Sequence, residues 1–139
     1  MTVGGSATIN RAGTTTTINQ TSNRAIIDWR SFDVKGNESV NFIQPSRGSI
    51  AVNRIHDSKA SQIDGSITAN GNIMLLNQNG VLFGKSARVD VGGLVAGAGD
   101  LVNPNEFMAG AAARIDGAHS GAAVVNRGRI TIAPGGLAG

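Results

Sequence analysis

The chain contains no cysteine and no tyrosine, and only 4% of its 139 residues are aromatic. The absence of cysteine excludes a disulfide framework, a thiolate metal site and a cysteine nucleophile. No apolar run reaches the about 18 residues of a transmembrane helix, and the first residues lack the basic and apolar segments of a signal peptide. Charged residues make up 15%, too few for a coiled coil or a helical bundle. A core must therefore be built from small and branched aliphatic side chains.

The basic residues are in excess but scattered. The net charge is +3 and the sequence pI is about 10.2, yet the closest pair of cations is Arg127 and Arg129. We interpret the arginines as solvated side chains on strand faces. With so few aromatic residues for base stacking, we expect no nucleic-acid partner.

Short apolar segments separated by Gly, Asn and Pro run along the first half of the chain. This pattern predicts strands. The predicted strands cover residues 6–10, 14–21, 24–34, 38–43 and 49–55. Within 24–34 the apolar residues change parity near Arg30, which predicts a bend there.

A denser repeat follows, in which Asn or Asp, then Gly, precede Ile or Val, as in residues 75–83 and 124–132. Gly and Asn tolerate positive φ, so we expect them to form the corners of a stacked parallel solenoid. About six rungs of about 20–25 residues would fit the length. An antiparallel β-sandwich is the alternative. The solenoid predicts an inward-facing set: Ile63, Ile67, Ile73, Leu75, Val81, Phe83, Val89, Val91, Val125, Ile130 and Ile132.

One segment departs from this pattern. Asn103, Pro104 and Glu106 occupy cap, first and third positions, which predicts one short helical turn over residues 103–109. We expect Phe107 and Met108 to dock on the core and the segment to be an excursion from the rod.

Residues that could carry catalysis or bind a metal are dispersed. His56 and His119 are far apart and lack neighbouring ligands, and the carboxylates are isolated, although Asp64 and Asp90 could approach each other on successive rungs. A polysaccharide-cleaving β-helix would need paired carboxylates. We therefore expect no enzymatic activity, no catalytic or metal-binding residues and no cofactor.

Several blocks together resemble the two-partner secretion domain at the N-terminus of filamentous-haemagglutinin-type exoproteins, closest to the high-molecular-weight adhesins. They are residues 23–34 (NRAIIDWRSFDV), 37–45 (NESVNFIQP), 50–55 (IAVNRI) and 61–96. The resemblance covers about residues 4–136 and implies an all-β, right-handed parallel β-helix, a single-stranded solenoid with an N-terminal cap and extra-helical β elements.

The resemblance also implies a function. Residues 1–139 would form one secretion domain, truncated at both ends, of a large adhesin or haemagglutinin-like protein. We expect this protein to reach the cell surface or medium through the periplasm. The implied partner is a cognate Omp85-type outer-membrane transporter with polypeptide-transport-associated domains. We expect a monomer with only transient outer-membrane association. A direct host-cell or carbohydrate-binding adhesion module is the alternative.

The family's Asn-Pro-Asn-Gly motif falls on Asn77, Gln78, Asn79 and Gly80, with Gln78 in place of Pro. We expect Asn77 and Asn79 to accept positive φ and to bond across a tight corner. Two interpretations stay open: the asparagines hold the turn, or the transporter reads them directly. Asn53 and Asn70 are candidate secondary positions for transporter recognition.

Overall fold

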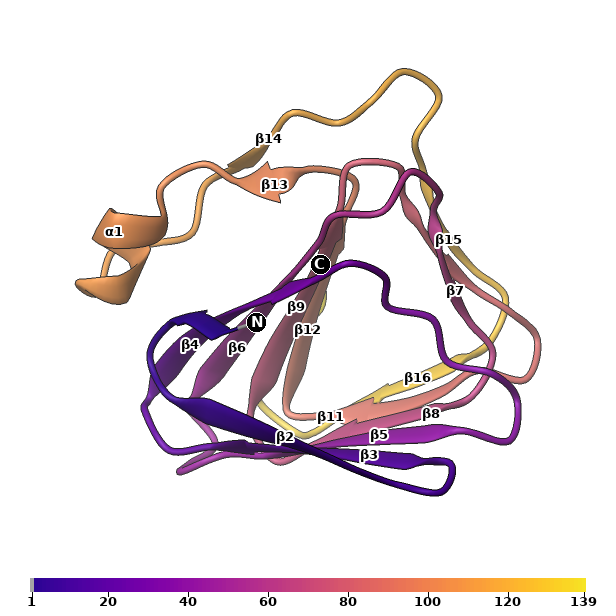
Figure 1. Cartoon of the computed structure of the whole chain (residues 1–139), viewed down its shortest axis with the longest axis horizontal. Helices are drawn as coiled ribbons and strands as arrows, with labels where there is room; N and C mark the ends of the chain where they lie inside the picture. The colour runs from indigo at the N-terminus through magenta and orange to yellow at the C-terminus, as the bar shows by residue number, and fades with distance from the viewer. Residues whose placement is uncertain (1) are drawn as a thin grey trace.

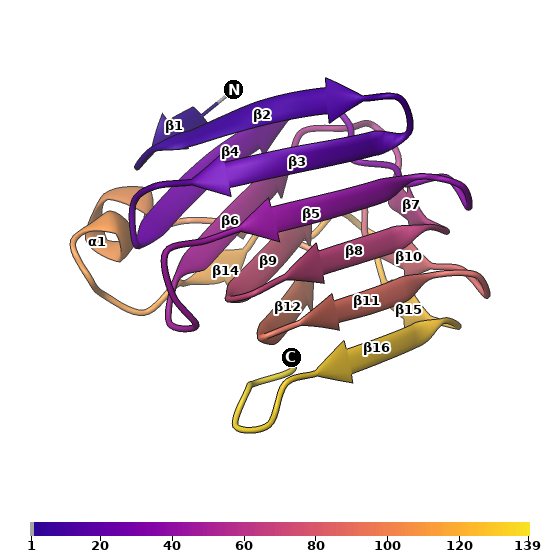
Figure 2. The same ribbon diagram turned by 90° about the horizontal axis from the view of Figure 1, so that it is seen from below.

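The computed structural model describes the backbone of residues 2–139 and the side chains of residues 5–139. Stacked strands form three faces around one interior, and the chain winds as a right-handed β-solenoid of about 3 turns (Figures 1 and 2). This confirms the predicted all-β parallel β-helix. The estimate of about six rungs is wrong, because the N-terminal segment forms a hairpin and residues 98–123 leave the stack.

The first face is a 5-stranded sheet in the order β1-β4-β6-β9-β12. Its strands are β1 (Thr2–Gly4), β4 (Arg24–Trp29), β6 (Ile50–Ile55), β9 (Asn72–Asn77) and β12 (Gly93–Gly97). From β4 onward the pairing is parallel, and β1 is antiparallel to β4. The chain leaves β4 at Trp29, and Phe32 still points into the core, which confirms the predicted bend.

The other two faces complete each turn. The second, in the order β16-β11-β8-β5-β3-β2, has six strands: β2 (Ala7–Ala12), β3 (Thr15–Gln20), β5 (Ser39–Ile43), β8 (Ser66–Ala69), β11 (Arg88–Val91) and β16 (Arg129–Ile132). The third consists of β7 (Ser61–Ile63), β10 (Val81–Phe83) and β15 (Val124–Asn126). Both stack in parallel except for the β2–β3 hairpin, which covers one end of the solenoid (Figure 2). This pairing excludes the β-sandwich.

The interior is a continuous apolar cluster fixed by the parallel register. Eight of the predicted core residues are buried there: Ile63, Ile67, Ile73, Leu75, Val81, Phe83, Val89 and Val91. Ile130 and Ile132 are partly buried, because the last turn is covered on one side only. The prediction for Val125 is wrong: it is 36% exposed and stacks on Leu82, between two inward positions of β10.

At one corner of the solenoid, glycines of successive turns meet backbone to backbone. The Gly92 N–H donates to the Gly71 carbonyl at 2.9 Å. A Cβ atom on Gly92 would lie 2.6 Å from that carbonyl oxygen, and one on Gly136 would overlap with the Gly92 oxygen. Glycine at these positions lets neighbouring turns approach to backbone contact.

The predicted excursion lies outside the solenoid and contains β13 (Asp100–Leu101), α1 (Pro104–Met108) and β14 (Ile115–Asp116) (Figure 1). Leu101 and Phe107 cover the outer side of the first face, where they pack on three aliphatic side chains: Ile26, Val52 and Leu76. The first face is therefore buried on both sides.

The helix begins with Pro104 and has Asn103 at its N-cap, as predicted, but the expected capping-box hydrogen bond is absent. Asn103 makes no capping hydrogen bond with its side chain. Its Nδ2 donates to the Ala112 carbonyl at 2.9 Å, and its Oδ1 accepts from the Arg114 N–H at 2.8 Å. The amide joins the two ends of the excursion because these backbone groups lie within its reach.

Candidate functional site

The Asn77–Gly80 tetrapeptide forms the corner between β9 and β10. The Gly80 N–H donates to the Asn77 carbonyl at 2.9 Å, which closes the turn. Gly80 has a φ of 105°, whereas no described non-glycine residue has a positive φ. The expectation that Asn77 and Asn79 adopt positive φ is therefore wrong, because Gly80 takes that conformation at no steric cost.

Asn77 connects two turns of the solenoid from a buried position. The residue is fully buried, with 0% of its surface exposed. Nδ2 donates to the Lys59 carbonyl and to Ser61 Oγ, each at 3.0 Å, and Oδ1 accepts from the Asn79 N–H at 2.8 Å. The Asn77 amide therefore stabilises the corner to which it belongs and fixes the spacing between this turn of the solenoid and the preceding one.

Residues 117–123, which we call the strap, cross the outside of this corner on the way from β14 to β15 (Figure 1). Gln78 Nε2 donates to the Gly117 carbonyl at 2.8 Å, and the His119 N–H donates to the Gln78 carbonyl at 2.8 Å. A side chain on Gly80 would overlap with the Ala123 carbonyl oxygen. The strap therefore needs a glycine at the fourth position of the tetrapeptide.

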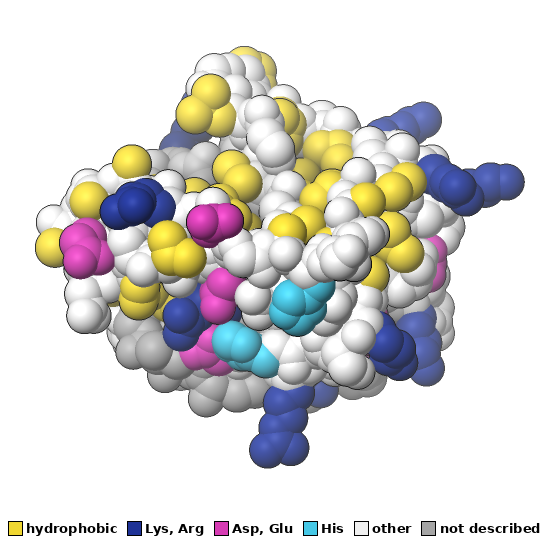
Figure 3. Space-filling model, turned by 90° about the horizontal axis from the view of Figure 1, so that it is seen from above, with side chains coloured by type: hydrophobic (Ala, Val, Ile, Leu, Met, Phe, Trp, Pro, Cys, Tyr) yellow, Lys and Arg dark blue, Asp and Glu magenta, His cyan; other side chains and the backbone are white. Residues whose placement is uncertain are grey.

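Asn79 lies between the strap and the preceding turn. Its Nδ2 donates to the Asp57 carbonyl at 2.6 Å, and its Oδ1 lies 2.8 Å from His119 Nδ1. Both histidines of the chain are visible on this side of the molecule (Figure 3). The sequence does not predict the strap, because residues 117–123 contain only Gly, Ala, Ser and one His and match no motif for this contact.

The other two candidate asparagines are not brought to this corner. Asn53 is inside the solenoid at 0% exposure, where Oδ1 accepts from Trp29 Nε1 at 2.9 Å and Nδ2 donates to the Met74 carbonyl at 3.0 Å. Asn70 is exposed and exchanges two 2.8 Å hydrogen bonds with the Gln44 backbone. Of these two asparagines, only Asn70 is accessible to a partner of the folded domain.

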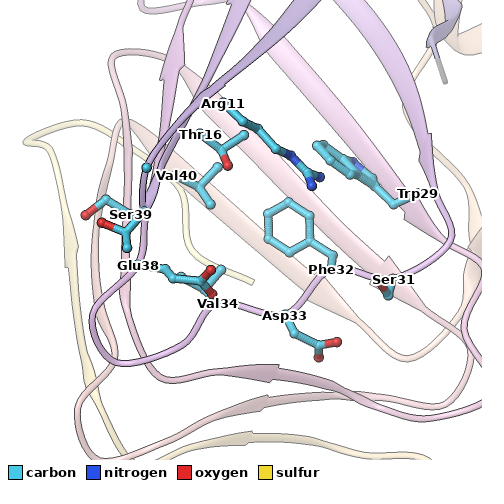
Figure 4. A pocket seen from close by; sticks show the side chains of 12 residues that line it. Arg11, Thr16, Trp29, Ser31, Phe32, Asp33, Val34, Glu38, Ser39 and Val40 are labelled. Atoms are coloured by element: carbon cyan, nitrogen blue, oxygen red, sulfur yellow. The ribbon is translucent and has the colours of Figure 1, made fainter.

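A pocket of about 270 Å³ opens beside the N-terminal hairpin (Figure 4). The Trp29 and Phe32 rings in its wall meet edge to face, with centroids 5.0 Å apart. Its two carboxylates accept from backbone: Asp33 from the Gln62 N–H and Glu38 from the Lys35 N–H, each at 2.8 Å. Trp29 is only 4% exposed, which disfavours the stacking platform that a sugar-binding adhesin would use.

The ionic cluster of the site is centred on Asp28. Arg54 binds its two oxygens at 2.9 and 3.1 Å, and His56 Nε2 lies 2.6 Å from Oδ1. Burial alone would raise the pKa of Asp28, but the hydrogen bonds from Arg54 and His56 outweigh burial and lower the pKa. The cluster therefore keeps Asp28 ionised and joins two neighbouring turns.

Residues 5–139 contain no group of three or more His, Asp or Glu side chains arranged to hold a metal ion. Asp64 and Asp90 do not stack, since Asp90 pairs with Thr68. In the described part of the chain, no helix is long and apolar enough to cross a membrane.

Comparisons with known proteins agree with this geometry. The sequence matches the TPS secretion domain family over residues 1–139. It is 42% identical over 102 residues to a heme/hemopexin-binding protein of Haemophilus influenzae. The aligned region covers 73% of this chain and 11% of the relative. A second such protein is 44% identical over 90 residues, covering 65% of this chain and 10% of the relative. The chain therefore spans about a tenth of these relatives' length.

The fold matches the crystal structure of the HMW1 secretion domain from Haemophilus influenzae. The TM-score is 0.84 at 32% identity, over 95% of this chain and 35% of that chain. The stacked parallel strands and the match to the family over the whole chain agree with each other. This chain therefore belongs to the TPS secretion domain family, the secretion domains of two-partner secretion exoproteins.

Proposed function

We propose that the domain is the secretion signal of a large exported adhesin-like protein. In the periplasm, a cognate Omp85-type outer-membrane transporter binds it through polypeptide-transport-associated domains. The domain then folds at the cell surface as a monomer. The family match supports this proposal, as do the much longer relatives in which the matched region is a small part.

The tetrapeptide acts at two stages in this proposal. In the folded domain, Asn77 has 0% exposure, so a transporter has no access to its side chain. The strap covers Gln78 and Asn79 through hydrogen bonds that span 39 and 40 residues of sequence. The transporter therefore reads the tetrapeptide while the chain is extended, before the strap reaches the corner. Strand addition would give the extended chain main-chain affinity for its partner.

Folding at the surface then begins from the capped end. The β2–β3 hairpin pairs with β5 and covers the first turn. β15 and β16 form the last strands of their faces, while residues 137–139 already bond to the outer edge of β12. Strands at the end of a stack offer unpaired backbone groups to a further strand. The folded domain thereby provides a template on which later turns of the exported protein assemble.

The burial and hydrogen bonding of Asn77 are the observation that suggests the test. Asn77→Ala and Ser61→Ala both remove the 3.0 Å hydrogen bond between these side chains, but only the first changes the tetrapeptide. Each variant is expressed behind an export leader with the cognate transporter. The secreted fraction is measured beside the unfolding midpoint of the purified domain.

Secretion of Asn77→Ala is expected to fall well below that of Ser61→Ala after correction for stability. Asn79→Ala should behave like Asn77→Ala, because both change the sequence that the transporter reads. Secretion that follows stability alone in all three variants would show that the corner is only structural.

A further inference from the structure

Folding gathers basic side chains that are scattered in the sequence. Lys85 and Arg88 lie on one turn, and Arg127 and Arg129 on the next. Arg88 pairs in register with Arg129, and the Arg127 N–H donates to the Phe83 carbonyl at 2.8 Å. Neighbouring turns are about 4.8 Å apart. All four residues are exposed, and we call them the basic strip.

The four cationic groups have no partner within residues 5–139. The salt bridges there join Arg54 and His56 to Asp28, and no side-chain hydrogen bond is made by the basic strip. Asp90 lies on the same strand as Arg88, and Asp64 lies on the preceding turn. Asp64 Oδ1 already accepts from Gln62 Nε2 at 3.1 Å. The strip therefore keeps an excess of positive charge.

The Arg88–Arg129 pair weakens the sheet locally, because like charges directly opposite each other are destabilising. The same column carries Ser39 and Ser66 in the two preceding turns. Serine therefore fits these positions, and the sheet itself has no need for arginine there. An external anion would remove the repulsion and bind both guanidinium groups through charge-assisted hydrogen bonds.

We propose that the basic strip binds a linear sulfated polysaccharide. Arginine forks suit sulfate geometry, and a chain lying along the stack meets cations on successive turns. All five aromatic side chains are buried, so the strip lacks the stacking platform of single-stranded nucleic-acid sites. It lies at the corner that leads into β11 and β16, whereas duplex readout uses an element inserted into a groove.

The test compares two double variants of the purified domain that lose the same charge. Arg88→Ser with Arg129→Ser changes the strip, and Arg30→Ser with Lys59→Ser removes two exposed cations elsewhere. Binding to heparin is measured in solution over a series of salt concentrations. Thermal unfolding of both variants confirms that they are folded.

The strip variant should bind heparin about tenfold more weakly or worse, because it loses two charge-assisted contacts. Its slope of log affinity against log salt should fall by about two. The control should retain most of the wild-type affinity. Equal losses of heparin affinity in both variants would show that binding depends on net charge alone, and would overturn the proposal. Tighter binding to a single-stranded oligonucleotide or to anionic phospholipid vesicles than to heparin would also overturn it.

Discussion

Buried amides hold successive turns of the solenoid at fixed heights. Asn53, Asn77 and Gln44 each donate from a buried side chain to a backbone carbonyl of another turn. Every buried side-chain N or O atom in the described residues has a hydrogen-bond partner. Because an unpaired buried amide is costly, a shift of one turn against the next would leave several polar groups unsatisfied. These residues therefore define the register that the aliphatic core fills.

The core should respond strongly to loss of volume. Ile73 is 1% exposed between Ala51 and Leu94 on neighbouring turns. Ile73→Ala should lower the free energy of unfolding by about 2–5 kcal/mol, because it removes buried methyl groups and leaves a cavity. Urea unfolding measures the change. Ile43→Ala, at a residue that is 54% exposed, is the matched control. A loss below about 0.5 kcal/mol at Ile73 would contradict the packing described here.

Asp28 should make stability depend on acid pH. Its lowered pKa means that its contribution is complete above the ordinary value of 3.8 and is lost as pH falls through the folded-state pKa. The loss should be about 1 kcal/mol or less, since the carboxylate is partly exposed and screened. Thermal unfolding from neutral pH to about pH 2 should show a shallower decline for Asp28→Asn than for wild type. Identical pH profiles would count against the contacts of Asp28 with Arg54 and His56.

The excursion outside the solenoid is held in place by one arginine, Arg24. Arg24 Nη1 donates to the Phe107 and Ala111 carbonyls, each at 2.7 Å, and its guanidinium carbon lies 4.5 Å from the centroid of the Phe107 ring. A five-residue helix is too short to be stable by itself. The last turn of α1 contains no basic residue of its own. Arg24 therefore provides the positive charge and the hydrogen-bond donor at this end of the helix, and it holds α1 on β4.

Removal of this contact should expose the excursion to protease. Arg24→Gln should speed tryptic cleavage after Arg114 about tenfold, because local opening of the segment becomes more frequent. Mass spectrometry of a time course identifies this cut. Arg11→Gln, at an exposed residue on the hairpin, is the control. An unchanged cleavage rate would show that the apolar contacts of Phe107 are sufficient.

The sequence predicts the strands well and the long-range contacts poorly. Alternation of Ile and Val with polar residues marks the strands, and the Asn-Gly repeat marks the corners, since both patterns act over a few residues. The parity of Val125 is misleading because the strand is short and its whole turn is largely exposed. The strap on Gln78 is invisible for another reason: a Gly117 carbonyl carries no sequence signature.

Stability should vary along the solenoid. β6 and β9 are paired on both edges and covered on both sides, whereas Val124 and Val125 of β15 are 42% and 36% exposed. Amide hydrogen exchange should therefore be at least about tenfold slower in β6 and β9 than in β15 and β16. Exchange measured by NMR tests each amide. Uniform protection along the stack would indicate a single cooperative unit without a loose end.

The contact between Gly71 and Gly92 also limits how the solenoid can vary during evolution. Backbone contact between turns leaves no room for a side chain on Gly71 or Gly92 themselves. The length of this corner is freer, since residues 44–49 form it between β5 and β6 and Gly92 alone forms it between β11 and β12. After β12, by contrast, the chain already makes a detour of residues 98–123 and returns to the stack in register at β15. Long insertions should therefore accumulate at the β12–β15 connection, while Gly71 and Gly92 themselves stay glycine. One solenoid can in this way carry different outer decorations on an unchanged interior.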